Sequence, residues 1–314
     1  MASSPFPSPT KTYHQTSYSA ISPTQPALST AGKSIVITGG GTGIGQAAAL
    51  SFAKSGTSNL LLLGRRTAPL EETRTLITTS YPKTAVHIAS ADLTDRDSLD
   101  TAFTNFTKAT GTPVDILFAN AGFDGQRGPL SSMNVEDFAQ NLTMNAVGNL
   151  NLVQAYLPHA PTAPKDGGKY RARIIHTSSA VVHAQVPTLG AYSTAKLAAA
   201  WMFDIVAKEN PDIFVMNYHP GIIATSMDAR GQEAGLSLEP KDDISLAADF
   251  PVWAASSASD FVGSGRFLWA HWDVDELKEI FAKIEKGEND DGLKLMGGVI
   301  EVNKKFTVGL VGWP

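Results

Sequence analysis

Tyr192 and Lys196 stand four residues apart in the stretch Tyr192-Ser193-Thr194-Ala195-Lys196. This spacing puts two side chains on one face of a helix, so a helix here would bring the phenol and the ammonium together. A neighbouring cation favours the phenolate and lowers the pKa of a tyrosine from its usual value of about 10. Such a tyrosine can exchange a proton with an alcohol or a carbonyl near neutral pH. The spacing therefore predicts general acid–base chemistry, and Ser179, thirteen residues before Tyr192, is a candidate partner for the reacting oxygen.

A second chemical signal is a run of glycines near the start of the chain, Thr38-Gly39-Gly40-Gly41-Thr42-Gly43-Ile44-Gly45. Glycine allows a sharp turn and a close approach of the backbone to a pyrophosphate, and a following helix directs free N–H groups at that anion. An isolated match of this kind is as often an ordinary turn. Its position directly after the first predicted strand favours a nucleotide cofactor held by Gly39, Thr42, Gly43, Ile44 and Gly45.

The second predicted strand ends at Gly64-Arg65-Arg66. Folds that bind NAD usually place a carboxylate here for the ribose 2′-hydroxyl, whereas an arginine suits the 2′-phosphate of NADP. Arg65 and Arg66 offer two guanidinium groups for that phosphate. The sequence thus predicts NADP, with NAD as the alternative if both arginines are simply solvated.

Elements that could position these groups alternate along the chain. Short apolar runs predict strands at Ser34–Thr38, Leu60–Leu63, Ala85–Ala89, Ile116–Ala119, Ile174–Thr177, Ile213–Tyr218 and Arg266–Ala270. Helical stretches are predicted at Gln46–Lys54, Leu70–Thr79, Ser98–Thr110, Val135–Tyr156, Ser193–Lys208 and Ile244–Ala255. This alternation predicts an α/β fold, a Rossmann-type doubly wound parallel sheet of about seven strands with helices on both faces.

Taken in order, these motifs resemble the short-chain dehydrogenase/reductase family in its single-domain branch, over about residues 33–270. The further motifs that carry the resemblance are Asp92-Leu93 after the third strand, Asn120-Ala121-Gly122 after the fourth, Asn145 in a helix, and Pro220-Gly221 with Ile223 and Thr225 after the sixth. The family often has Lys or Arg where Thr42 stands, so the NADP prediction depends on Arg65 and Arg66.

The resemblance implies a role for each matching residue. Tyr192 would be the general acid/base, Ser179 would hydrogen-bond the reacting oxygen, and Lys196 would bind the nicotinamide ribose and lower the pKa of the tyrosine. Asn145 would position a water between Lys196 and solvent. Asn120 would mainly brace neighbouring strands. The hydride chemistry belongs to the cofactor, and the protein supplies position and charge.

The substrate is expected outside the carboxyl ends of the strands. Three stretches are predicted to line its site: 180–191, 123–130 and 222–251. Within them the specific candidates are Ala180, His183, Gln185, Val186 and Met227. A lone histidine such as His183 or His219 is more often a structural residue than a chemical one. This mostly apolar material fits a hydrophobic carbonyl or secondary alcohol.

The ends of the chain differ from the predicted domain. Seventeen of residues 1–31 are Ser, Thr or Pro, so we interpret residues 1–32 as an arm that is disordered or laid over the surface. Tyr13, Tyr18, Ile21 and Leu28 are its candidate anchors. Residues 271–314 are predicted as an extension that packs on the core or on a partner subunit, with a helix at Val274–Lys286 and aliphatic residues over Leu293–Leu310.

Composition narrows the function classes. The chain has 314 residues, 25 basic and 30 acidic, for a formal net charge of −5, which argues against a nucleic-acid partner. It has no cysteine, so disulfides, thiolate metal sites and a cysteine nucleophile are excluded, and no metal is predicted. Its longest apolar run, Leu197–Phe203, is far shorter than the ~20 residues of a membrane span.

The sequence therefore predicts an NADP-dependent oxidoreductase that interconverts a carbonyl and an alcohol on a small molecule. We expect it to be cytoplasmic and to form a homodimer or homotetramer. Two alternatives remain: a lyase or isomerase that uses the same fold with a bound cofactor, and a cofactor-binding sensor without turnover. The complete set of Ser179, Tyr192, Lys196 and Asn145 argues against the sensor, which needs no acid/base.

Overall fold

A single parallel sheet forms the centre of the molecule. The computed structural model describes residues 8–164, 168–225, 229 and 240–286. Its strands, in the spatial order β3-β2-β1-β4-β5-β6-β7, are β1 (Ser34–Thr38), β2 (Asn59–Gly64), β3 (Ala85–Ser90), β4 (Ile116–Ala119), β5 (Ala172–Thr177), β6 (Ile213–His219) and β7 (Arg266–Trp269). Every neighbouring pair is parallel, so each connection crosses over the sheet.

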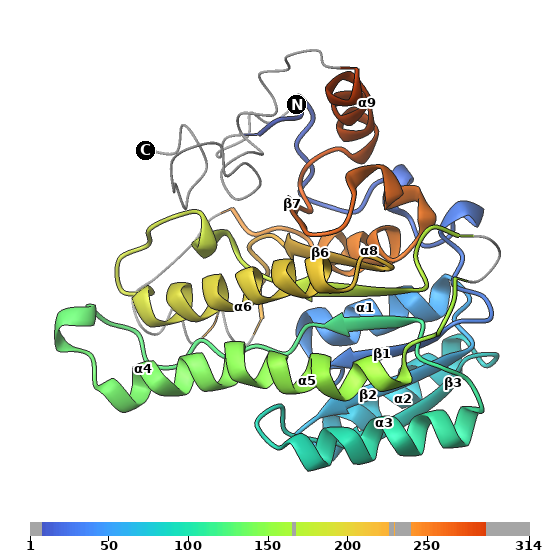
Figure 1. Cartoon of the computed structure of the whole chain (residues 1–314), viewed down its shortest axis with the longest axis horizontal. Coiled ribbons are helices and arrows are strands. Elements are labelled where there is room, and N and C mark those ends of the chain that lie inside the picture. The colour runs from blue at the N-terminus through green and yellow to red at the C-terminus, as the bar shows by residue number, and fades with distance from the viewer. Residues whose placement is uncertain (1–7, 165–167, 226–228, 230–239, 287–314) are drawn as a thin grey trace.

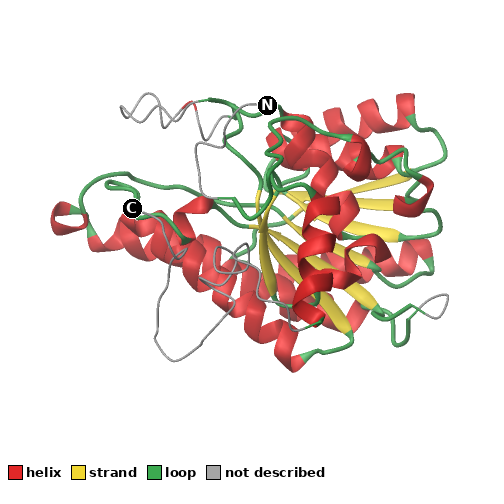
Figure 2. Ribbon diagram, turned by 90° about the horizontal axis from the view of Figure 1, so that it is seen from above, coloured by secondary structure: helices red, strands yellow, loops and turns green. Residues whose placement is uncertain are grey.

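Helices cover both faces of this sheet (Figures 1 and 2). One face carries α1 (Gly43–Lys54), α2 (Thr67–Ser80) and α8 (Ile244–Ala254), and the other carries α3 (Arg96–Thr110), α4 (Val135–Leu142), α5 (Gly148–Tyr156) and α6 (Gly190–Glu209). The predicted α/β class, with a doubly wound sheet of seven strands, is confirmed. No helix in the described part of the chain has the length and hydropathy needed to cross a bilayer.

Two buried clusters, one on each face, hold the sheet between the helices. Ile35 and Ile37 of β1 belong to the cluster under α1 and α8, and Val36 between them belongs to the cluster under α3, α5 and α6. Successive strand residues point to opposite faces, so a strand covered on both sides must be apolar throughout. All five residues of β1 are buried, which explains why it appears in the sequence as a continuous apolar run.

The long helix predicted over 135–156 is interrupted. A π-helical turn, Thr143–Val147, separates α4 from α5, and Asn145 lies in it. Such a π-helical turn changes the hydrogen-bonding pattern within the helix and is frequent at functional sites. The sequence did not predict it.

The described part of the N-terminal segment lies against the C-terminal end of the domain, beside α8 and α9 (Val274–Glu285) (Figure 1). Ile21 and Leu28 are buried, and the Tyr18 hydroxyl accepts a hydrogen bond from the Val274 N–H at 3.0 Å. Helix α9 buries Leu277 and Phe281. The aliphatic stretch Leu293–Leu310 lies outside the described residues.

Candidate active site

A cleft of about 530 Å³ lies at the carboxyl ends of the strands. It is the position at which open α/β sheets bind ligands, beside the point where the strand order reverses between β1 and β4. Most of the predicted site residues line it: Gly39, Thr42, Gly43, Ile44, Arg65, Arg66, Asp92, Leu93, Asn120, Ala121, Gly122, Ser179, Ala180, Val186, Tyr192, Lys196, Pro220, Gly221, Ile223 and Thr225. The fold therefore brings predicted site residues from eight separate segments of the sequence into one continuous cleft.

The glycine loop follows β1 and leads into α1, which begins at Gly43. Gly39 and Gly43 have φ angles of +68° and +55°, which side-chain-bearing residues adopt only with strain. Gly45 does not line the cleft. A Cβ at Gly45 would collide with the carbonyl oxygen of Gly39, so this glycine lets the loop fold onto its own helix.

Arg65 and Arg66 lie at the opposite end of the cleft, where β2 ends, and both are exposed. Burial alone would raise the pKa of Asp92, but hydrogen bonds from Thr94 and the charge of Arg65 lower it below the usual value. The Asp92 carboxylate thus remains ionised close to Arg65. This end of the cleft presents two guanidinium groups, and glycine occupies position 64, where NAD-binding folds usually have a carboxylate.

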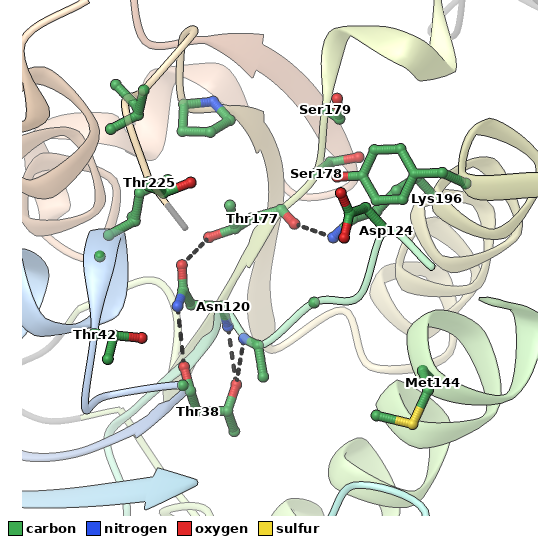
Figure 3. Close-up of a pocket in the computed structure, with 18 of the residues that line it drawn as sticks. Thr38, Thr42, Asn120, Asp124, Met144, Thr177, Ser178, Ser179, Lys196 and Thr225 are labelled. Atoms are coloured by element: carbon green, nitrogen blue, oxygen red, sulfur yellow. Dashed lines mark hydrogen bonds between the residues drawn. The ribbon is translucent and has the colours of Figure 1, made fainter. Parts of the chain in front are cut away.

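Asn120 braces three strands. Its N–H donates to Thr38 Oγ1 at 2.9 Å and its Nδ2 donates to Thr38 O at 3.1 Å, while Thr177 Oγ1 donates to its Oδ1 at 3.2 Å (Figure 3). These bonds tie β1, β4 and β5 together at the floor of the cleft. The structural position expected for Asn120 is therefore the one observed.

Lys196 is buried under the cleft. Its Nζ donates to the carbonyl oxygen of Thr177 at 2.9 Å (Figure 3) and lies 5.9 Å from the centre of the Tyr192 ring. Burial disfavours the charged ammonium and lowers the pKa of Lys196 to about 8. The helix α6 that carries both residues begins at Gly190, where a Cβ would meet Leu130 at 2.6 Å.

The expectation that Lys196 lowers the pKa of Tyr192 is corrected by the structure. The pKa of Tyr192 lies above that of a free tyrosine because burial penalises the phenolate more than the hydrogen bond with Ser179 favours it. The charge of Asp124 raises this pKa further and that of Arg127 lowers it. In this structure the hydroxyl of Tyr192 is therefore a protonated group held against Ser179.

Asn145 does not line the cleft but holds one of its walls. Its Nδ2 donates to Phe123 O at 2.6 Å, and its Oδ1 accepts from Phe123 N–H at 3.0 Å. A Cβ at Gly122 would lie 3.3 Å from Lys196 Nζ and 3.5 Å from Asn145 Oδ1, so both side chains lie beside the Gly122 backbone.

The segment after β6 crosses the cleft towards the glycine loop. A Cβ at Gly43 would lie 3.4 Å from Thr225 Cγ2. Gly221 has a φ of +104°, and a Cβ there would lie 2.7 Å from Asp242 Oδ2, so only glycine fits. Asp242 in turn accepts from the Ile222 N–H at 2.8 Å and lies 2.9 Å from His271 Nε2. These contacts fix the path of residues 220–225, the segment that the family resemblance implies at the nicotinamide.

At the substrate end, two predictions about lining residues are wrong. His183 is buried outside the cleft, 4.4 Å from the Phe267 ring, and burial lowers its pKa to about 4. Gln185 is exposed outside the cleft. Met227 lies outside the described residues. The apolar wall is instead formed by Met144, Val181, Ala184, Val186 and Leu189.

Asp124 and Arg127, which the sequence did not single out, line the cleft near Tyr192. Arg127 donates to the Asp124 carboxylate at 2.8 Å. The stretch 123–130 was expected at the substrate, but neither residue was singled out. The available signal was a pair of opposite charges three residues apart within a glycine-rich loop, Asp124-Gly125-Gln126-Arg127-Gly128. His219 is also in the lining, and its Nδ1 accepts from the Ala180 N–H at 3.1 Å, a structural contact.

Known proteins agree with this architecture. The family model for short chain dehydrogenases matches residues 33–234. A short chain dehydrogenase/reductase of Claviceps purpurea is 34% identical, over 87% of this chain and 89% of the relative. One from Aspergillus novofumigatus is 30% identical over 86% and 91%. The crystal structure of a short chain dehydrogenase from Salmonella enterica, 24% identical, superposes with a TM-score of 0.68 over 78% of this chain and 98% of that one. By its sequence match, and with a fold in agreement, this chain belongs to the short-chain dehydrogenase/reductase family of oxidoreductases.

Proposed function

We propose that the protein is an NADP(H)-dependent oxidoreductase that interconverts a carbonyl and a secondary alcohol on a largely apolar small molecule. The observation that carries this proposal is a single cleft with two chemically different ends. Tyr192, Ser179 and Lys196 meet at one end, and Arg65 and Arg66 stand at the other, with the glycine loop between them.

The residues present fit a dinucleotide phosphate. The glycine loop leaves its backbone open at Gly39 and Gly43, and the amino end of α1 supplies N–H groups for a pyrophosphate. Arg65 and Arg66 suit a 2′-phosphate, and Gly64 offers no carboxylate that would repel it. When bound, the cofactor supplies the hydride.

The chain's own residues supply the proton and hold the oxygen. Tyr192 carries a protonated hydroxyl, which donates to a carbonyl oxygen during reduction and accepts the proton back during oxidation. Ser179, which lines the same end of the cleft as Tyr192, orients the same oxygen. Lys196, held by Thr177 O, places a cation near the ring, and Asn145 fixes the adjoining wall through Phe123.

A direct assay tests the proposal. Purified protein mixed with NADPH and a panel of apolar ketones should consume NADPH, seen as loss of its absorbance at the reduced nicotinamide band. Binding of NADPH with no oxidation by any ketone would favour the lyase, isomerase or sensor alternatives instead.

The cofactor preference is tested by removing both guanidinium groups. In Arg65→Ala/Arg66→Ala the ratio of NADPH to NADH affinity should fall by at least about tenfold, because even one charge-assisted hydrogen bond to a phosphate contributes about 1.5–3 kcal/mol. Fluorescence titration of both cofactors measures the ratio. Arg74→Ala, which removes an exposed arginine of α2, is the matched control and should leave it unchanged. An unchanged ratio in the double variant would refute the NADP assignment.

We also propose that α5 and α6 form a subunit interface. Four apolar side chains leave 40–50% of their surface exposed: Val147 at the end of the π-helical turn that leads into α5, Leu150 in α5, and Trp201 and Ile205 in α6. The ribbons of α5 and α6 lie next to each other (Figure 1), and α6 packs against the π-helical turn. Exposed apolar clusters of this kind mark interaction sites. Trp201→Glu should therefore shift the protein to a smaller species in light scattering coupled to size-exclusion chromatography. Leu76→Glu, at a similarly exposed leucine on α2, should not, and a monomeric parent protein would contradict the proposal.

A further inference from the structure

We propose that Asp124 and Arg127 form a recognition site for a hydroxyl group of the substrate, so that the substrate class is an apolar ketone with a hydroxyl close to the reacting carbonyl. This inference rests on the proposed function and adds the chemical class of its substrate. It starts from the charged pair at the substrate end of the cleft, which the catalytic proposal does not use.

Asp124 is buried and Arg127 is largely buried, yet both face the cleft. The Asp124 side chain is 4% exposed and the Arg127 side chain 14%, and both residues line the cleft. Figure 3 shows Asp124 at the end of the cleft where Ser178 and Ser179 lie. Burying two charges costs several kcal/mol, which their mutual attraction only partly offsets, so a buried ion pair is weak evidence of a stabilising role.

The loop that carries the pair is held at both ends. The Asn145 side chain hydrogen-bonds to both the N–H and the carbonyl oxygen of Phe123, the residue directly before Asp124. The Gly128 N–H, directly after Arg127, donates to Thr188 O at 2.9 Å. Thr188, at a φ of +72°, is the only non-glycine residue with a positive φ in the described ranges. Backbone strain of this kind persists where the surrounding structure enforces it, often at ligand sites.

The two side chains together select a neutral hydroxyl. An ionised carboxylate only accepts hydrogen bonds and a guanidinium only donates them. A hydroxyl can donate to Asp124 and accept from Arg127 at once, whereas a carboxylate on the substrate would be repelled by Asp124 and an ammonium by Arg127. The remaining wall, which includes Met144, Val186 and Leu189, is apolar and suits a hydrocarbon skeleton.

The hydroxyl must lie close to the reacting carbonyl. Asp124 and Arg127 are both near enough to the Tyr192 hydroxyl to change its ionisation, in opposite directions. All three residues line the same cleft, so a group bound by the pair lies at the same end of it as the oxygen that Tyr192 protonates. This placement restricts the substrate to hydroxyketones in which the two oxygens are near neighbours.

Matched ketones test the inference. The kcat/KM for each ring-hydroxylated isomer of 1-tetralone is compared with that for 1-tetralone itself, with NADPH as reductant. We expect at least one isomer to be preferred by at least about tenfold, because a site built to hydrogen-bond a hydroxyl discriminates against the analogue that lacks it. In Asp124→Asn/Arg127→Gln, which removes both charges and keeps a polar amide at each position, this ratio should fall to about one. The control Arg96→Gln/Asp100→Asn removes an exposed ion pair of α3 with the same 2.8 Å separation and should keep the ratio.

A binding measurement separates this inference from the proposed function. Calorimetry of the same compounds with the Tyr192→Phe variant and NADP⁺ records recognition without turnover. Reduction of the tetralones with no hydroxyl preference, or with a preference that survives in the double variant, would overturn the recognition site and leave the proposed function standing. If no tetralone is reduced, the proposed function fails for this class. Calorimetry then tests the recognition site on its own. Tighter binding of a hydroxylated tetralone that is lost when Asp124→Asn/Arg127→Gln is introduced supports the site, and equal affinities for all the tetralones overturn it.

Discussion

Tyr192→Phe is expected to lower kcat for carbonyl reduction by about a thousandfold while changing the affinity for NADPH only severalfold. The substitution keeps the ring and its packing and removes only the hydroxyl that lies against Ser179. Because burial keeps that hydroxyl protonated, the wild-type reduction should persist across neutral pH. Alcohol oxidation, which needs the tyrosine deprotonated, should instead become faster as the pH rises.

Single-turnover kinetics with NADPH separates the two effects, since cofactor binding and the chemical step are recorded independently. Tyr81→Phe, at a partly buried tyrosine that ends α2, is the matched control and should keep wild-type kcat. A Tyr192→Phe enzyme with more than about a tenth of wild-type kcat would exclude Tyr192 as the proton donor.

Lys196→Met is expected to stabilise the cofactor-free protein while it impairs catalysis. Burial lowers the pKa of Lys196 from 10.5 to about 8, which makes the folded protein about 3 kcal/mol less stable at pH 7 than it would be with an unperturbed lysine. Methionine removes this penalty but leaves the carbonyl of Thr177 without its donor, at a cost of about 1 kcal/mol. The net gain in the free energy of unfolding at pH 7 should be about 2 kcal/mol.

The pH dependence has a definite sign. The unfolded chain binds the lysine proton up to about pH 10.5 and the folded chain only up to about pH 8, so wild-type stability rises with pH across this window. The advantage of Lys196→Met in urea denaturation should therefore shrink as the pH rises from 7 to 10. Lys208→Met, at an exposed lysine in the last turn of α6, should show no such trend. A Lys196→Met protein that is less stable at pH 7 would contradict the buried-charge argument.

Most of the fold could be predicted because the sheet is covered on both faces. Each strand is then a short apolar run, and β1 and β4 have the predicted bounds, Ser34–Thr38 and Ile116–Ala119. The π-helical turn at Thr143–Val147 could not be predicted in the same way. It brings Asn145 to the Phe123 backbone, and a contact between residues 22 apart leaves no periodic pattern in the sequence.

The cofactor half of the cleft was predictable because glycines at close approaches and residues at strand ends have fixed spacings. The substrate half depends on which way a loop turns its side chains. A short 3₁₀ helix at Ala180–Val182 directs His183 into the core against Phe267. The sequence pattern predicted His183 at the substrate because it does not show this change of direction. Asp124 and Arg127 face the cleft only because Asn145 and Thr188, distant in sequence, hold their loop.

The proposed reaction transfers hydride between NADPH and a carbonyl carbon. The most direct test uses NADPH that carries deuterium at both C4 positions of the nicotinamide, with a ketone that the protein turns over, and locates the label by NMR. Deuterium is expected on the carbinol carbon of the alcohol product, in proportion to the NADPH consumed. A product that forms without deuterium, while the cofactor keeps both deuterons, would exclude hydride transfer and would point to a lyase or an isomerase.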